Sequence, residues 1–354
     1  MKVLCAMSGG VDSSVAALLL RRAGHEVVGV TMKLWGGESD TGCCSVSDVD
    51  DARRVAQQLD IDHLVFNFAD DFTAGVVDPY VAAHRAGTTP NPCIECNRTV
   101  KFDRLADRAE LLGFDAVATG HHARIEHTDG SLALLRGADP AKDQSYVVHM
   151  LDQHRLARTL FPVGGLDKMQ VRAIAADAGL RTAAKPDSQD VCFITSSAGR
   201  ETFLGHRIPL RRATVVDTDG AELGEVAAVE MVTIGQRKGL GLPGGGPKRY
   251  VVDVDVGERR VTVGDADDLL TDGAVVTGLS WTDADRLPGG RRHLGSLRVQ
   301  ASAHGSTAPA DVALRADGAA DVVWRHRRRR IAPGQSVVFY DDADRRVVGG
   351  GVAA

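Results

Sequence analysis

The feature that most constrains the fold is a glycine-containing loop close to the N-terminus. An apolar stretch, Lys2–Met7, runs directly into the string SGGVDSS at residues 8–14, and an Ala/Leu-rich stretch of helical character continues to Arg22. Two adjacent glycines can turn the chain sharply and bring backbone N–H groups close to an anion. The serine hydroxyls and the positive end of the following helix also favour an anion. The order of strand, loop and helix therefore predicts a phosphate-binding β–α unit.

Two properties of this loop limit its chemistry. Asp12 would repel a phosphate unless a cation lay between them, so we expect Mg²⁺ to bridge Asp12 and the phosphates. The loop lacks the Gly-Lys-Ser/Thr ending of the mononucleotide P-loop, so γ-phosphate transfer is not expected. The alternative is a string that only turns the chain and caps a helix. The whole string resembles the PP-loop of the ATP pyrophosphatase superfamily, whose members cleave ATP between the α and β phosphates and transfer AMP to a substrate oxygen.

Strand-like and helix-like segments alternate over the first half of the chain. Further strands are expected over Glu26–Met32, His63–Phe68 and Asp115–Thr119. Helices are expected after a cap at Ser47 and over Lys101–Leu112. Repeated β–α units of this kind predict an α/β fold with a doubly wound parallel sheet.

The second half has a different character from about residue 205. Helical periodicity fades, Gly and Pro become frequent, and short β-branched runs are separated by turn residues. This pattern predicts two small β-rich domains, the last of them a β-barrel. We expect domains over residues 1–204, 205–270 and 271–354. The expected strands are 213–216, 249–254, 260–263, 295–301, 319–323, 336–340 and 346–352.

Composition excludes several classes of protein. The chain has 354 residues, of which 44% are hydrophobic and 25% charged, and no apolar run could span a bilayer. Its apolar N-terminal stretch is too short for a signal peptide. We therefore expect a cytoplasmic protein without a membrane partner. A net charge of −5 argues against indiscriminate coating of nucleic acid, but it permits a local basic face.

Six unevenly spaced cysteines do not suggest a disulfide framework. In a reducing compartment such residues are more often buried, metal-binding or catalytic. Two strings stand out: TPNPCIECNR at 89–98, with Cys93 and Cys96, and KPDSQDVCFI at 185–194, with Cys192. The remaining cysteines, Cys5, Cys43 and Cys44, are interpreted as structural.

Together with the phosphate loop, these strings resemble the bacterial tRNA-specific 2-thiouridylases. Further matching strings are ATGHH at 118–122, KDQSY at 142–146, LFPVG at 160–164, TIGQRKGL at 233–240 and PGQS at 333–336. The resemblance runs through nearly the whole chain. It implies a tRNA-uridine 2-sulfurtransferase that adenylates the C2 oxygen of wobble uridine 34 and gives 2-thiouridine, AMP and pyrophosphate. It also implies tRNAs of the Lys, Glu and Gln type as substrates, and a cysteine desulfurase or sulfur-relay protein as donor.

This chemistry explains why cysteines are needed. A pyrimidine C2 carbonyl is a poor electrophile until adenylation makes its oxygen part of a good leaving group, and a thiolate or persulfide must then attack. By resemblance, Cys192 carries sulfur as a persulfide. Cys96 is the second catalytic cysteine, which either releases that sulfur or forms a transient Cys96–Cys192 disulfide that a reductant must reset.

The resemblance also implies two sets of binding residues, with the C-terminal barrel binding tRNA. ATP contacts are implied for Ala6, Met7, Ser8, Gly9, Gly10, Val11, Asp12, Ser13, Ser14, Met32 and Gly120. Contacts with tRNA are implied for Asn91, Pro92, Cys93, His121, Lys142, Asp143, Gln144 and Gln335. The string QASAHG at 300–305 departs from the basic, aromatic-containing string of many members, so tRNA contacts are not transferred there. The run Arg325–Arg330, RHRRRR, is expected to contact phosphates instead.

Several alternatives remain open at this stage. Cys93, Cys96 and Cys192 could hold an iron–sulfur cluster with one open iron. Some members carry Asp at the position of Cys93, so an acid–base role there is in doubt in this chain. Cys93 and Cys96 could form half of a zinc site, but the chain has no second Cys-x-x-Cys to complete it. The other rival functions are a PP-loop ATP-dependent ligase or amidotransferase acting on a small molecule, and a tRNA-binding protein without catalysis.

Overall fold

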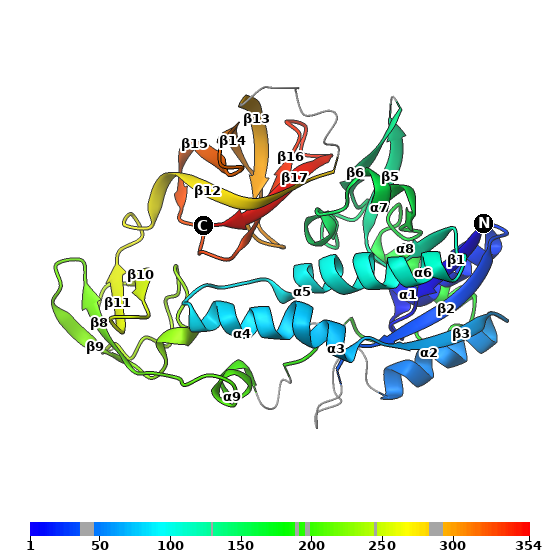
Figure 1. Ribbon diagram of the computed structural model, residues 1–354, viewed down its shortest axis with the longest axis horizontal. Helices are drawn as coiled ribbons and strands as arrows, with labels where there is room; N and C mark the ends of the chain where they lie inside the picture. Colours follow the sequence, from blue (N-terminus) through cyan, green and yellow to red (C-terminus); the bar gives the residue numbers. More distant parts are fainter. Residues whose placement is uncertain (36–45, 129, 188–190, 195–198, 244–245, 283–292) are drawn as a thin grey trace.

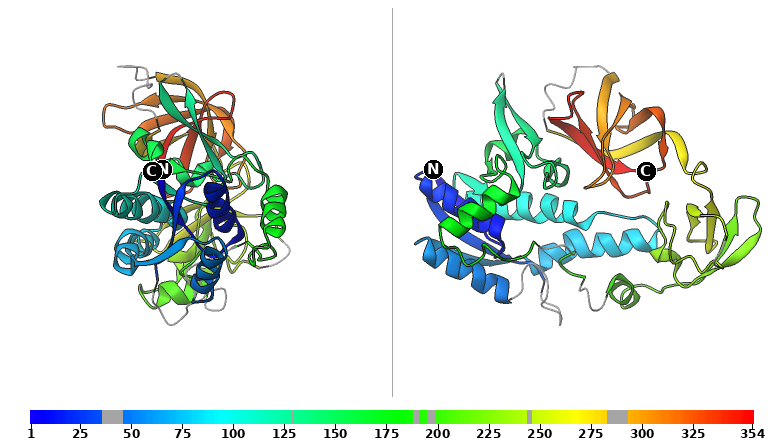
Figure 2. Two further views of the ribbon diagram at one scale, coloured as in Figure 1. Left: turned by 90° about the vertical axis from the view of Figure 1, so that its right-hand side faces the viewer. Right: turned by 180° about the vertical axis from the view of Figure 1, so that it is seen from behind.

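The computed structural model describes residues 1–354 except 36–45, 129, 188–190, 195–198, 244–245 and 283–292. Figure 1 shows an N-terminal α/β region at one end, a small β sheet at the other, and a barrel above the helices that run between them. The two further views in Figure 2 show the same arrangement from the side and from behind. Among the described residues, no helix has the length and apolar character needed to cross a membrane.

The N-terminal sheet has five parallel strands in the order β3-β2-β1-β4-β7. Their bounds are β1 Lys2–Ala6, β2 Glu26–Lys33, β3 Asp62–Asn67, β4 Ala116–Ala118 and β7 Thr159–Leu160. The first strand is central, with Val3 paired to Val27 on one side and to Ala116 on the other. The predicted α/β fold with a doubly wound parallel sheet is confirmed.

Helices cover both faces of this sheet. On one face, α1 (Val11–Arg22), α2 (Val46–Gln58) and α8 (Lys168–Asp177) share an apolar cluster. On the other face, two long helical segments share a second cluster. The cap predicted at Ser47 is wrong, because the helix already begins at Val46.

The two long segments pass from α-helix through π-helix and back. The first consists of α3 (Ala69–Phe72), η1 (Thr73–Val77) and α4 (Asp78–Arg85), and the second of α5 (Pro92–Glu95), η2 (Cys96–Arg104) and α6 (Leu105–Leu111). The second begins nine residues before the predicted start at Lys101, because the Asn91 side chain accepts hydrogen bonds from the backbone N–H groups of Cys93 and Ile94. A Cβ on Gly75 would lie 2.8 Å from Thr99 Oγ1, so the segments touch at their π-helical parts.

Before β7 the chain forms an antiparallel hairpin that the sequence patterns did not predict. It comprises β5 (Ala123–Thr128) and β6 (Ser131–Arg136), and it is followed by η3 (Ser145–Val148) and α7 (Gln153–Ala157). After α8, α9 (Gly199–Gly205) leads to the small sheet, whose order is β10-β11-β8-β9. Its elements are β8 Ala213–Asp217, β9 Glu222–Val226, η4 Val229–Met231, β10 Tyr250–Asp255 and β11 Arg260–Gly264.

The C-terminal strands close into a barrel in the order β12-β15-β14-β13-β16-β17. Their bounds are β12 Leu270–Trp281, β13 His293–Gln300, β14 Ala308–Leu314, β15 Ala320–Arg329, β16 Ser336–Tyr340 and β17 Val347–Ala353. Buried residues such as Val299, Val312 and Phe339 fill its interior. The predicted barrel is confirmed, although β12 and β14 were not among the expected strands.

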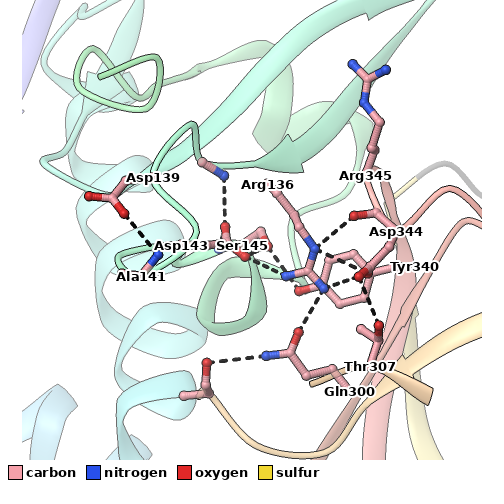
Figure 3. Close-up of polar contacts among 12 residues, drawn as sticks. Arg136, Asp139, Ala141, Asp143, Ser145, Gln300, Thr307, Tyr340, Asp344 and Arg345 are labelled. Carbon is pink, nitrogen blue, oxygen red and sulfur yellow. Dashed lines mark hydrogen bonds and ion pairs between the residues drawn. The ribbon is translucent and has the colours of Figure 1, made fainter. Parts of the chain in front are cut away.

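The barrel is docked firmly on the N-terminal region. Tyr340 and Val347 of the barrel share an apolar cluster with Ile94 and Leu134. At the end of β6, Arg136 donates hydrogen bonds to Asp143, Gln300 and Asp344, and its guanidinium carbon lies 3.7 Å from the centre of the Tyr340 ring (Figure 3). We call this group, Arg136, Asp143, Gln300, Tyr340 and Asp344, the Arg136 junction.

Candidate active site

The phosphate loop lies at the carboxyl edge of the parallel sheet, between β1 and α1, where doubly wound sheets bind ligands. Gly9 has a φ of +73°, and helix α1 begins at Val11. The loop is closed by its own hydroxyls: Ser13 Oγ accepts from the Ser8 N–H, and Ser13 and Ser14 both donate to the Gly10 carbonyl. The N-terminal N–H groups of α1 therefore begin directly at the loop, as an anion site requires.

Two glycines hold other segments tightly against this loop. A Cβ on Gly9 would lie 2.4 Å from the carbonyl oxygen of Asp48, and a Cβ on Gly120 would lie 2.6 Å from the backbone N of Ser13. Gly120 follows β4, so the ends of β1 and β4 meet here. Met32, near the end of β2, is half-buried at the same edge. Of the residues to which the resemblance assigns ATP contacts, those outside the loop thus lie at the same sheet edge.

Asp12 is the centre of the charge arrangement at the loop. Lys168 Nζ lies 2.7 Å from both carboxylate oxygens of Asp12, and His122 Nε2 lies 3.2 Å from Oδ1. Burial would raise the pKa of Asp12, but the hydrogen bonds from His122 and Lys168 outweigh burial and hold that pKa below its usual range. The carboxylate is therefore ionised, which is the form that binds a divalent cation.

A second carboxylate, Asp187, ties the string that carries Cys192 to the loop. It pairs with Lys168 and Lys142, each at 2.8 Å, and with Arg172 at 2.9 Å. Burial opposes ionisation, but the hydrogen bonds from Lys142 and Lys168 lower the pKa of Asp187 to about 2. Lys185 of the same string pairs with Asp48 and Asp51 of α2.

The structure brings Cys96 and Cys192 to one apolar cluster. Cys96 is buried and is the first residue of η2, and Cys192 is half-buried and packs against the same cluster. Neighbouring Phe193 anchors the string, with its ring 5.6 Å from that of Phe72 and 5.1 Å from that of Phe203. π-Helical turns are frequent at functional sites, which fits the position of Cys96.

The other cysteines differ in their surroundings. Cys93 is exposed. Burial raises the pKa of Cys5 to about 12, so its thiolate is not formed near neutral pH, in agreement with the structural interpretation. Cys43 and Cys44 lie outside the described residues.

The loop fits Mg²⁺ with ATP better than the cysteines fit a cluster. Mg²⁺ is usually held by one or two carboxylates together with phosphate oxygens, and Asp12 supplies such a carboxylate. Within the described part of the chain, no group of three or more His, Cys, Asp or Glu side chains is placed to hold a metal ion. Cys93, Cys96 and Cys192, three of the four cysteines that the structure describes, are therefore not among residues placed as a three-ligand set.

Several residues expected at the tRNA are engaged inside the molecule. His121 is buried, and its Nδ1 lies 2.7 Å from Thr119 Oγ1. Burial lowers its pKa well below the ordinary value, so it is neutral. Asp143 accepts from Arg136, from two backbone N–H groups and from the Ser145 hydroxyl (Figure 3). Gln144 Oε1 accepts from the His122 N–H, and Lys142 pairs with Asp187. A contact between these side chains and RNA would have to replace such bonds.

The remaining expected tRNA residues lie around the start of the second helical segment. Asn91 caps α5, Pro92 is buried, and Cys93 is exposed beside them. Gln335 donates from Nε2 to the carbonyl of Thr89, so the barrel is joined to this turn. Asn91, Pro92 and Cys93 therefore follow a turn to which the barrel is bonded through Gln335, the residue just before β16.

The arginine run belongs to a strand. Residues 325–329 form the end of β15, and all of them are exposed, as is Arg330. Arg327 and Arg330 make ion pairs at 3.5 and 3.9 Å with Asp272 and Asp253, both of which are exposed. The guanidinium of Arg329 lies 5.3 Å from the centre of the Tyr250 ring. The run thus offers exposed cations where the barrel meets the small sheet.

Sequence patterns did not identify Lys168, Asp187 or Arg136 as site residues. They also did not identify His122 as a partner of Asp12. Lys168 lies outside the quoted strings, and its partner Asp12 is 156 residues away. Asp187 and His122 lie inside quoted strings, so a charged residue within a matching string was the available signal.

The fold and the site define the structural class of this protein. A parallel sheet whose first β–α connection is a phosphate loop, followed by a small β sheet and a closed barrel, makes the chain a PP-loop α/β protein with two appended β modules. Residues 1–196 match the family model described as tRNA methyl transferase HUP domain. Residues 201–265 match the tRNA methyl transferase PRC-barrel domain, and residues 271–353 match the aminomethyltransferase beta-barrel domain.

Curated relatives match the chain over nearly its whole length. The tRNA-specific 2-thiouridylase MnmA of Chloroflexus aggregans is 45% identical over 99% of this chain and 97% of the relative. The proteins of the same description from Herpetosiphon aurantiacus and Mycobacteroides abscessus are 44% and 48% identical, over 99% and 96% of this chain and 97% and 95% of their own lengths. This chain belongs to the family of tRNA-specific 2-thiouridylases, as the resemblance predicted.

Proposed function

We propose that this chain is a tRNA-uridine 2-sulfurtransferase, which activates the C2 oxygen of wobble uridine 34 with ATP and replaces that oxygen with sulfur. The observation that supports the proposal is that Lys168 pairs with Asp12 of the phosphate loop and with Asp187, which belongs to the same string as Cys192. Asp12 of the loop is ionised, and Met32 and Cys192 both pack against the apolar cluster that contains Cys96. The loop supplies activation, and the cysteines supply a nucleophile.

In the first step the protein holds the triphosphate for in-line attack. The backbone N–H groups at the start of α1 and the hydroxyl of Ser8 bind phosphate oxygens. Bound at Asp12, Mg²⁺ would neutralise charge on the phosphates. The uridine C2 oxygen attacks the α-phosphorus, the bond to the β-phosphate oxygen breaks, and pyrophosphate leaves. Gly120 permits the close approach of the β4 end to the loop.

In the second step the cysteines deliver sulfur. The outer sulfur of a Cys192 persulfide attacks C2, and AMP leaves with the former C2 oxygen. The Cys96 thiolate then attacks Cys192 Sγ and forms a Cys96–Cys192 disulfide, so the transferred sulfur remains on C2 with the bonding electrons. In the other order, Cys96 releases hydrosulfide from the persulfide, and hydrosulfide attacks C2. Both orders leave the same disulfide, which an external thiol must reduce.

The partners follow from this chemistry. A cysteine desulfurase or sulfur-relay protein supplies the persulfide sulfur, and tRNAs of the Lys, Glu and Gln type supply the uridine. The base must leave its stack to reach the site. We assign residues 1–204 to the thiolation domain, 205–270 to the central domain and 271–354 to the tRNA-binding barrel. Asn91, Pro92, Cys93 and Gln335 border the base, and the exposed arginines of β15 contact phosphates.

The test separates activation from sulfur transfer. Pyrophosphate release that depends on tRNA is measured for wild type, Cys96→Ser and Cys192→Ser in one turnover with a persulfide donor. We expect all three to release pyrophosphate, and only wild type to form 2-thiouridine. A ligase acting on a small molecule would release pyrophosphate without tRNA, and a non-catalytic tRNA-binding protein would release none. An iron–sulfur enzyme would carry iron and visible absorbance after anaerobic purification, which this proposal does not require.

A further inference from the structure

Lys168 occupies an unusual position between the two parts of the site. Its ammonium contacts both oxygens of Asp12 in the phosphate loop at 2.7 Å and Oδ1 of Asp187 at 2.8 Å, and its side chain is only 12% exposed. One cation is thus shared by two carboxylates, one in the phosphate loop and one in the string that carries Cys192. The chemical steps above do not use this lysine.

The backbone of Lys168 is fixed, so only its side chain can move. Lys168 is the first residue of α8, and Asp167 and Gln170 form a reciprocal capping box around it. The Lys168 N–H also donates to Asp139 Oδ2 at 3.0 Å. A lysine side chain has four flexible bonds, and its ammonium can shift by a few ångströms while the helix stays in place.

Neither carboxylate depends on Lys168 alone. Asp187 keeps ion pairs with Lys142 and Arg172, and Asp12 keeps the contact with His122. When a divalent cation binds Asp12, the carboxylate gains a stronger partner. The ammonium can then turn toward the triphosphate without leaving either carboxylate unpaired. Phosphate oxygens bound at the loop would offer the ammonium a new anionic partner.

We propose that Lys168 is a phosphate-binding residue of the ATP site, held by Asp12 and Asp187 until the nucleotide arrives and then transferred to the triphosphate. The inference rests on the proposed function for the identity of the nucleotide. The phosphate loop has no lysine of its own, and Lys168 supplies one from a helix more than 150 residues further along the chain. Its role is confined to activation, so sulfur loading on Cys192 does not require it.

The experiment measures Mg²⁺·ATP binding by titration calorimetry for wild type, Lys168→Met, Lys168→Arg and Asp187→Asn. Lys168→Met should weaken binding by about tenfold or more, as expected for one charge-assisted hydrogen bond to phosphate. Lys168→Arg should recover part of this loss. Asp187→Asn should bind as tightly as wild type or more tightly, because it no longer competes for the ammonium. A lysine that only holds Asp12 to Asp187 predicts instead that Lys168→Met and Asp187→Asn weaken binding alike.

Lys185 provides a matched control, since it also joins two carboxylates, Asp48 and Asp51, without touching Asp12. Lys185→Met should bind Mg²⁺·ATP within about threefold of wild type, a difference smaller than one hydrogen bond. Persulfide loading of Cys192 should be unchanged in Lys168→Met, which also shows that this variant is folded. Binding of Mg²⁺·ATP by Lys168→Met within twofold of wild type would overturn the proposal. If ATP binding depends on Lys168 but no 2-thiouridine forms, the proposed function fails and this inference stands.

Discussion

The Arg136 junction gives a stability prediction whose size follows from its contacts. The guanidinium donates to Asp143 at 2.6 Å, to Asp344 at 2.8 Å and to Gln300 at 3.0 Å, and it stacks on the Tyr340 ring (Figure 3). The Asp143 side chain is 7% exposed, so Arg136→Met leaves a buried carboxylate without its cation. Removing one partner of such a pair costs about 3–5 kcal/mol.

Two features place Arg136→Met at the lower end of that range. Asp143 keeps hydrogen bonds from the N–H groups of Gly137 and Ser145 and from the Ser145 hydroxyl. The second acid, Asp344, is 38% exposed and can be hydrated. We therefore expect a loss of about 3 kcal/mol in the free energy of unfolding.

Denaturant unfolding followed by tryptophan fluorescence measures this loss, since Trp281 and Trp324 lie in the barrel. Arg124→Met on the same hairpin is the control. Arg124 forms an ion pair with the exposed Glu126 and donates one hydrogen bond, from Nε to the Arg136 carbonyl. Its removal leaves no buried carboxylate, so it should shift the midpoint far less. In a double-mutant cycle, Arg136→Met and Asp143→Asn should be coupled. A loss for Arg136→Met equal to that of the control, with no coupling, would refute the reasoning.

Three further predictions concern acid stability, the loop and thiol reactivity. Burial lowers the pKa of His149 from 6.5 to about 4, so between these pH values the unfolded chain binds a proton at His149 that the folded chain does not bind. Urea titrations should show that the free energy of unfolding decreases from pH 6.5 toward pH 4, and that the decrease is smaller by about 3 kcal/mol in His149→Gln than in wild type. Gly9→Ala should weaken ATP binding by tenfold or more, whereas Gly24→Ala, at a similar φ of +81° but in open space, should leave ATP binding unchanged. Iodoacetamide at pH 8 should label Cys93 rapidly and Cys5 hardly at all, as peptide mapping would show; equal labelling would contradict the burial of Cys5.

Local sequence patterns predicted the parts of the fold whose causes are local. The phosphate loop needs only a strand, two glycines and a helix in succession, and the barrel strands 336–340 and 346–352 are continuous β-branched or glycine-containing runs. The β5–β6 hairpin was missed because apolar and charged residues alternate only over the first four residues of ARIEHT, which is a short signal for a strand. β12 was missed because its twelve residues include Gly273 and Gly278, which interrupt the apolar run.

The charge arrangement at the site could not be predicted, because it depends on tertiary structure. Lys168 and Asp12 meet only when α8 packs against α1, and Arg136 meets Asp344 only when the barrel docks. Matching strings predicted Cys96 and Cys192 as catalytic residues but did not show how the fold places them. In the structure, η2 and the string around Phe193 pack on one apolar cluster.

The central claim is that this chain replaces oxygen by sulfur at C2 of a tRNA uridine. The direct measurement is mass spectrometry of the nucleosides from a tRNA transcript incubated with the purified chain, ATP, Mg²⁺ and a persulfide donor. The account predicts 2-thiouridine at the wobble position with wild type, and none when ATP is omitted or Cys192 is replaced by Ser. Wild type that yields no 2-thiouridine, or that yields a methylated nucleoside instead, would contradict it.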